Sequence, residues 1–149
     1  MTEQQFRQAI VEEAARWLGT PYKNVGRMRG VGANCAQLLY GVYQGAGVLP
    51  DGTEPRWYAS QLHVHSREER LVEYVKAYGA VEIAESGVGP GDIILYLTGQ
   101  SHGHAAIVIE YPERMVHTLK TTGCCYGHCT KEGRVAQFDR RYFTVWKPE

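Results

Sequence analysis

The sequence predicts a single α+β domain, spanning residues 1–149, in which N-terminal helices pack on a central antiparallel sheet of about five to six strands. Two observations support this prediction. Apolar residues recur at helical spacing in the first half of the chain, and short strand-like runs separated by turn residues follow in the second half. The length fits one domain, and the apolar fraction of 44% is close to that of globular proteins.

The first helix is marked at both ends. Thr2 and Gln5 have the spacing of a capping box. Gly19 and Pro21 end the helical pattern, because glycine and proline terminate helices. The apolar face between these ends consists of Phe6, Ile10, Ala14, Trp17 and Leu18.

A glycine-rich loop over residues 20–33 leads into a second helix, which we expect from Cys35 to Gly45. Asn34 is a good N-cap for this helix, because its side chain can accept a hydrogen bond from the first helical turn.

A third helix is expected after Ser66 and Glu69, which again have capping-box spacing, and Gly79 ends it. From there the period of the apolar residues changes to that of strands. The expected strands cover residues 81–83, 93–97, 105–109, 115–119, 135–138 and 143–146. Helices followed by a meander of short strands indicate the α+β class.

The composition also limits the partners and the compartment. Lys plus Arg and Asp plus Glu are both 16, so the net charge is zero, which argues against a nucleic-acid partner. The first 19 residues hold three glutamates and no long apolar run, which predicts neither a signal peptide nor a membrane span. We therefore expect a protein that is cytoplasmic as synthesised, has no membrane partner and keeps its four cysteines reduced.

Cys35 is the first candidate for chemistry. It is expected in the first turn of a helix, where the helix dipole favours the thiolate. The glycines before it would let a substrate backbone come close. The alternative is a small buried residue that packs a helix start, and position alone does not separate the two.

Two histidines could complete a catalytic set with this thiol. His104 begins an apolar strand, where it could serve as the base, and His102, two residues earlier, competes for that role. His117 lies in the next strand, which could bring it beside His104 to fix the tautomer of the ring. A nucleophile, a base and an orienter form the triad that recurs on unrelated folds. Taken alone, His104 is better explained as a capping or surface histidine, and His117 is about equally well explained as a half-exposed strand residue.

Two blocks of the sequence resemble the NlpC family of papain-like cysteine peptidases. The first, LGTPYKNVGRMRGVGANCAQLLYGVYQGAGVLP, resembles the family's Gly-Thr-Pro-Tyr turn, its glycine-rich loop and the cysteine that opens a helix. The second, GVGPGDIILYLTGQSHGHAAIVIEYPERMVHT, resembles its Pro-Gly-Asp strand, its His-initiated strand and the strand with a third polar residue. Together the blocks run from about Trp17 to His117.

The resemblance implies a papain-like fold and a cysteine peptidase or amidohydrolase that cleaves amide bonds in bacterial cell-wall peptides through a thioester acyl-enzyme. By position, Cys35 would be the nucleophile, His104 the base and His117 the orienter, and Tyr22 would line the substrate site. No cofactor and no metal are expected. The lack of an export signal would suit a phage-associated or otherwise divergent member, delivered to the cell wall by a phage tail or secretion assembly or by non-classical export.

One departure from the family pattern concerns the substrate. Where the family has Asp-Cys-Ser-Gly, this chain reads Asn34-Cys35-Ala36-Gln37. In the family, the flanking Asp and Ser help hold the free amino group of the substrate. Asn34 and Ala36, at these substrate-binding positions, supply neither the charge nor the hydroxyl. An amidase or acyltransferase for another acyl group, or a catalytically weak binding or assembly module of the same fold, is therefore the alternative.

The segment CCYGHC is a second cluster of reactive side chains. Its Cys124, Cys125, His128 and Cys129 could bind zinc, but adjacent cysteines lack the usual spacing of zinc ligands. Redox-sensitive thiols and an inert loop are the other interpretations, and the inert loop is favoured.

Overall fold

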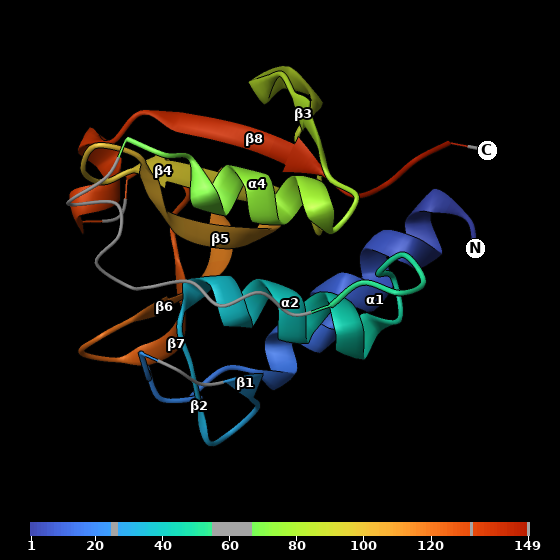
Figure 1. Ribbon diagram of the computed structural model, residues 1–149, viewed down its shortest axis with the longest axis horizontal. Coiled ribbons are helices and arrows are strands. Elements are labelled where there is room, and N and C mark those ends of the chain that lie inside the picture. The colour runs from blue at the N-terminus through green and yellow to red at the C-terminus, as the bar shows by residue number, and fades with distance from the viewer. Residues whose placement is uncertain (25–26, 55–66, 132, 149) are drawn as a thin grey trace.

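The computed structural model describes residues 1–24, 27–54, 67–131 and 133–148 and shows three helices on one six-stranded sheet (Figure 1). The helices are α1 (Glu3–Arg16), α2 (Cys35–Ala46) and α4 (Arg70–Ala77). Helix α1 packs on α2, and α4 lies against strand β5. A small antiparallel pair, β1 (Arg27–Met28) and β2 (Gly32–Ala33), precedes α2.

The sheet is antiparallel throughout, in the order β3-β8-β4-β5-β6-β7. Its strands are β3 (Val81–Ile83), β4 (Ile93–Leu97), β5 (His102–Glu110), β6 (Arg114–Leu119), β7 (Gly123–Gly127) and β8 (Arg140–Thr144). Two short 3₁₀ turns, η1 (Glu85–Gly87) and η2 (Gly133–Gln137), lie between strands. This arrangement confirms the predicted α+β class with helices on a central antiparallel sheet.

Both faces of the sheet are buried in its middle. Ile93 and Leu95 of β4 point into the cluster formed with the helices, whereas Ile94 and Tyr96 point into a second cluster on the opposite face. Side chains alternate between the faces of a strand, so apolar residues at every position of β4 require cover on both sides. The segment that follows β7 contributes Cys129 and other residues to the second cluster.

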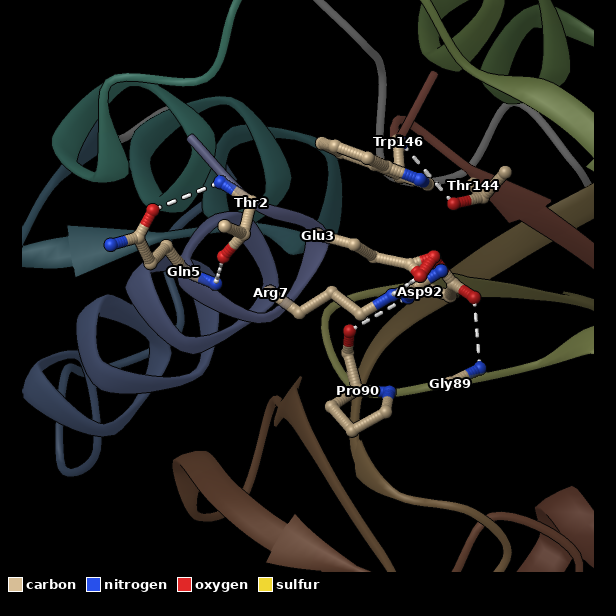
Figure 2. A network of polar contacts seen from close by, with 9 residues as sticks. All are labelled: Thr2, Glu3, Gln5, Arg7, Gly89, Pro90, Asp92, Thr144 and Trp146. Atoms are coloured by element: carbon tan, nitrogen blue, oxygen red, sulfur yellow. Dashed lines mark hydrogen bonds and ion pairs between the residues drawn. The ribbon is translucent and has the colours of Figure 1, made fainter. Parts of the chain in front are cut away.

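Helix α1 is joined to the sheet by a polar network, shown in Figure 2. Nη1 of Arg7 donates to Oδ1 of Asp92 at 2.8 Å and to the carbonyl of Pro90 at 2.9 Å. The second oxygen of Asp92 accepts the backbone N–H of Gly89 at 2.9 Å. At its start, α1 has the predicted capping box between Thr2 and Gln5.

Three expectations about elements are corrected. The strand expected over residues 135–138 is wrong, because residues 135–137 belong to η2 and Phe138 follows it in a bend. The segment favoured as an inert loop lies largely in β7, which pairs with β6. The third helix begins at Arg70 and has Glu69 at its N-cap with no side-chain capping bond; Ser66 lies outside the described residues.

Two strands also differ in their bounds. The last strand covers Arg140–Thr144 rather than residues 143–146. Strand β5 begins at His102, so His104 is its third residue rather than its first. Within the described ranges, no helix is long and apolar enough to cross a membrane.

Candidate active site

The start of α2 is fixed by Asn34. Its Oδ1 accepts the backbone N–H of Gln37 at 2.9 Å, which is the N-cap bond expected from the sequence. Its Nδ2 donates to the carbonyl of Asn24 at 2.8 Å. Both ends of the buried amide are therefore bonded within the chain, and the first residue of the helix, Cys35, is held in a defined position.

The thiol of Cys35 lies between this helix start and strand β5. Its Sγ donates to the carbonyl of Gly103 at 3.6 Å, and the residue is 8% exposed. Burial raises the pKa of the Cys35 thiol to about 11, and backbone N–H groups, first that of Ala105 and then those of Ala36 and Cys35, lower it in part. Desolvation therefore outweighs the effect of the helix dipole, which alone would favour the thiolate.

Two of the candidate residues meet as an imidazole pair. Nε2 of His104 lies 3.0 Å from Nδ1 of His117, and the ring centroids are 5.2 Å apart. The two residues come from β5 and β6, which are antiparallel neighbours as expected. His117 is 1% exposed, and the Tyr96 ring packs on His104 with centroids 5.6 Å apart. The expected juxtaposition of the two histidines is confirmed, whereas their catalytic roles stay predictions.

His102, the competing candidate, is bound elsewhere. Its Nδ1 lies 2.5 Å from one carboxylate oxygen of Glu69, and its backbone N–H donates to the other oxygen at 2.7 Å. Sequence reasoning missed Glu69 and Gly103. The spacing from Ser66 suggested a capping role for Glu69, and nothing in the sequence near Gly103 indicated a contact with the thiol.

The residues expected to bind substrate surround the start of α2. Tyr22 is half-buried, forms a parallel bridge with Ala33, and has Nζ of Lys120 at 6.0 Å from its ring centroid. Asn34 and Ala36 are 2% and 1% exposed. Substrate contact by these three residues stays a prediction.

The cluster CCYGHC does not gather into one site. Cys124 lies in the cluster on the helix side of the sheet, whereas Cys129 lies in the cluster on the opposite face. Cys125 is half-buried, and Nδ1 of His128 accepts backbone N–H groups of the two residues after Cys129. Across the described part of the chain, no three His, Cys, Asp or Glu side chains are placed to hold a metal ion.

Comparison with solved structures identifies the fold. The NlpC/p60 domain of the peptidoglycan hydrolase SagA matches with a TM-score of 0.59 and 21% identity, over 91% of this chain and 96% of that domain. The chain has the NlpC/p60 fold. No protein-family model matches the sequence, and a comparison with curated proteins likewise finds no match.

Two further structures share the NlpC/p60 fold. A lipoprotein-like protein of the NLP/P60 family from Staphylococcus aureus matches with a TM-score of 0.61 and 21% identity, over 95% of this chain and 42% of that one. The peptidoglycan hydrolase RipB from Mycobacterium tuberculosis matches with a TM-score of 0.60 and 16% identity, over 99% of this chain and 70% of that one. The chain thus spans nearly all of the SagA domain and less than half of the staphylococcal protein.

Proposed function

We propose that this chain is a cysteine hydrolase that cleaves amide bonds in bacterial cell-wall peptides, with Cys35 as nucleophile, His104 as base and His117 as orienter. One observation carries the proposal. A cysteine at a helix start contacts the residue that precedes His104, and His104 is paired at 3.0 Å with a second imidazole. The structures of SagA and RipB, both described as peptidoglycan hydrolases, support the choice of substrate.

The contact with His117 supports a different task for each ring nitrogen of His104. Nε2 of His104 faces His117, so Nδ1 of His104 is the atom that would exchange a proton with the thiol. The buried Cys35 thiol, whose pKa is raised to about 11, is protonated at neutral pH. His104 would therefore remove the proton as sulfur attacks, acting as a general base rather than as the partner of a preformed thiolate.

The reaction then follows two balanced steps. Sulfur of Cys35 bonds to the substrate carbonyl carbon, the C–N bond breaks, and His104 returns its proton to the departing amine, which leaves a thioester. Water, deprotonated by His104, attacks the thioester, and the carboxylic acid and the thiol are released. The side chain of Asn34 already accepts the N–H of Gln37. The N–H groups of Cys35 and Ala36 are the other donors at this helix start that lie near the sulfur, and they would hold the oxyanion.

A second acyl substrate is favoured by one observation. The Asn34 amide is bonded at both ends within the chain, and Ala36 is buried, so neither offers a group to a free amino terminus. An amide or ester substrate without a free amino group, processed by the same thiol, is the alternative. A screen that finds turnover of such substrates and no cleavage of cell-wall peptides would favour it.

The test is mass spectrometry of purified peptidoglycan fragments incubated with the wild type and with Cys35→Ala. We expect cleavage by the wild type and a loss of at least about 1,000-fold in the variant, because the nucleophile of a covalent mechanism is removed. Cys125→Ser is the matched control, since it alters a half-buried thiol elsewhere and should keep wild-type turnover. Equal cleavage by the wild type and Cys35→Ala would refute the assignment.

A further inference from the structure

Glu69 uses both carboxylate oxygens to hold the first residue of β5. One oxygen accepts the backbone N–H of His102 at 2.7 Å, and the other lies 2.5 Å from Nδ1 of the same residue. Glu69 stands at the N-cap of α4, where a carboxylate commonly accepts a backbone N–H of the helix, yet it makes no such bond. Its side chain therefore ties the helix start to the sheet instead of capping the helix.

The residue held by Glu69 adjoins a β-bulge. Tyr96 of β4 pairs with His104, whereas the next residue, Leu97, pairs with His102, so Gly103 is an extra residue in β5. Bulges redirect the groups that follow them in a strand. Here the carbonyl of Gly103 accepts the Cys35 thiol at 3.6 Å, and the residue after the bulge is the proposed base.

Arg141 of β8 also contacts the Glu69 carboxylate. Nη1 of Arg141 lies 3.5 Å from the Glu69 oxygen that contacts the His102 ring. The guanidinium of Arg141 also donates to both oxygens of Glu82, at 2.9 and 2.6 Å. Strands β3 and β8, which carry Glu82 and Arg141, are thereby linked to the start of β5.

We propose that Glu69 is a positioning residue: by holding His102, it sets the Gly103 bulge that places a carbonyl against the Cys35 sulfur and the His104 ring beside His117. This inference rests on the proposed function. Glu69 contacts His102 and Arg141, so we infer that it acts on the site through His102. Its removal should loosen the bulge and so disturb the contact between the Gly103 carbonyl and the Cys35 thiol.

The test compares Glu69→Ala, Glu69→Gln and Glu73→Ala. Glutamine keeps an acceptor for the His102 N–H and an amide that can donate to Nδ1 of a neutral imidazole, so it is the conservative variant. Glu73 is an exposed glutamate on the same helix and serves as the matched control. The first readout is the rate at which iodoacetamide alkylates Cys35 at pH 8, followed by peptide mass spectrometry, which needs no substrate.

We expect Glu69→Ala to speed Cys35 alkylation at least threefold, because the buried sulfur loses the fixed carbonyl that holds it. Amide hydrogen exchange at His102 should accelerate at least tenfold, because its acceptor is gone. With a cleaved peptidoglycan fragment, kcat should fall at least tenfold while KM stays within twofold. Glu69→Gln should remain within threefold of the wild type in alkylation rate, amide exchange and kcat, and Glu73→Ala should match the wild type in each.

The proposal is overturned if Glu69→Ala leaves the alkylation rate unchanged, or if Glu73→Ala alters it equally. Should Glu69→Ala fail to fold, as judged by near-UV circular dichroism, Glu69→Asp replaces it with the same expected direction, because the shorter side chain cannot span both contacts. Failure of the proposed function is recognised separately, by full turnover in Cys35→Ala, and the alkylation rates then still decide the role of Glu69.

Discussion

At the scale of single residues, the state of the Cys35 thiol decides which mechanism the site can use. A helix start offers partial positive charge, which favours thiolate, whereas removal from water favours the neutral thiol. Desolvation is the larger effect here, and it raises the pKa of Cys35 to about 11. The resting site therefore holds a neutral thiol, and proton removal belongs to the attack step.

This state predicts a pH profile for Cys35 alkylation in the absence of substrate. The rate should be low at pH 7 and should rise about tenfold per pH unit from pH 7 to pH 10, because the thiolate is the reactive species. Iodoacetamide labelling with peptide mass spectrometry measures it, and Cys35→Ala corrects for the other thiols. A rate that already reaches its plateau near pH 7 would show a preformed thiolate and contradict the general-base mechanism.

The candidate site could be predicted from the sequence where each residue carries a local signal. Cys35 follows a glycine-rich loop and an N-cap residue, and His104 and His117 lie in recognisable strands. Glu69 carries no such signal, because its partner His102 is 33 residues away. Its spacing from Ser66 also indicated a capping box, which is a local role. Contacts of this kind follow from the fold and not from the neighbouring sequence.

At the scale of elements, two errors have physical reasons. Val135 and Phe138 are spaced three apart, which suits one turn of a helix better than a strand, in which residues three apart lie on opposite faces. The N–H of Phe138 bonds to the carbonyl of Val135 at 3.2 Å. Strand β7 has the sequence GCCYG, which contains no β-branched residue. It becomes a strand because tertiary neighbours on both sides supply hydrogen bonds.

The outer neighbour of β7 is the turn after α1. The N–H of Cys124 donates to the carbonyl of Thr20 at 2.8 Å, and the N–H of Gly19 donates to the carbonyl of Cys124 at 2.9 Å. Gly123 permits this approach, because it has a φ of +72° and a Cβ there would lie 2.4 Å from the Thr20 oxygen. The contact fixes the turn that leads to Tyr22.

Gly123→Ala should therefore destabilise the protein more than alanine at another glycine of similar backbone. Gly47 has a φ of +73° and nothing within 4 Å of the position of a Cβ, so Gly47→Ala should cost about 1–2 kcal/mol for the left-handed backbone alone. Gly123→Ala should cost about 2 kcal/mol more, because the added atom also overlaps a backbone oxygen. Urea unfolding measures both, and equal losses would contradict this packing argument.

The link between α1 and the sheet gives a second prediction at this scale. Burial raises the pKa of Asp92, and Thr144, Gly89 and Arg7 lower it in part. Arg7→Met should lower the free energy of unfolding by about 3 kcal/mol at pH 7, because it leaves a buried carboxylate without its cation. Glu3→Gln, which removes only the 3.9 Å pair at the exposed end of the network, should change it by less than about 0.5 kcal/mol.

The pH dependence of this loss distinguishes an electrostatic cause from a packing cause. Folding raises the pKa of the Asp92 carboxyl, so folding is favoured while this carboxyl is protonated. Its contribution to the free energy of unfolding is therefore present at low pH and is lost as pH rises through the folded pKa. Without Arg7 the pKa of Asp92 rises further. The deficit of Arg7→Met should thus shrink between pH 7 and pH 4.5, and a deficit that is constant with pH would point to lost packing alone.

At the scale of the whole molecule, the order of the strands in the sheet is the feature that local patterns could not supply. The last strand, β8, enters between β3 and β4, so strands that follow one another in sequence are separated in the sheet. Periodicity reports which residues face a core, and it carries no information on which strand is the neighbour. The fold class and the bounds of the first two helices follow closely from the sequence, whereas this insertion follows from packing.

Burial of thiols over the whole fold predicts how stability changes at high pH. The pKa values of Cys35, Cys124 and Cys129 are each raised to about 11 from an ordinary value of 9.0, with desolvation as the largest cause. The unfolded chain therefore binds fewer protons than the folded one between these values. Each thiol contributes a fall of up to about 1.4 kcal/mol per pH unit in the free energy of unfolding across that window.

Urea unfolding of the wild type at pH 8, 9, 10 and 11 should therefore show a free energy of unfolding that declines more and more steeply with pH above pH 9. Cys124→Ala should be less stable than the wild type at pH 8, because it leaves a cavity, but its decline above pH 9 should be shallower by up to about 1.4 kcal/mol per pH unit. Ser86→Ala, an exposed substitution that removes no titrating group, should parallel the wild type. Parallel curves for Cys124→Ala and the wild type would mean that this thiol titrates alike in the folded and unfolded states, and that burial on the helix side of the sheet does not hold it protonated.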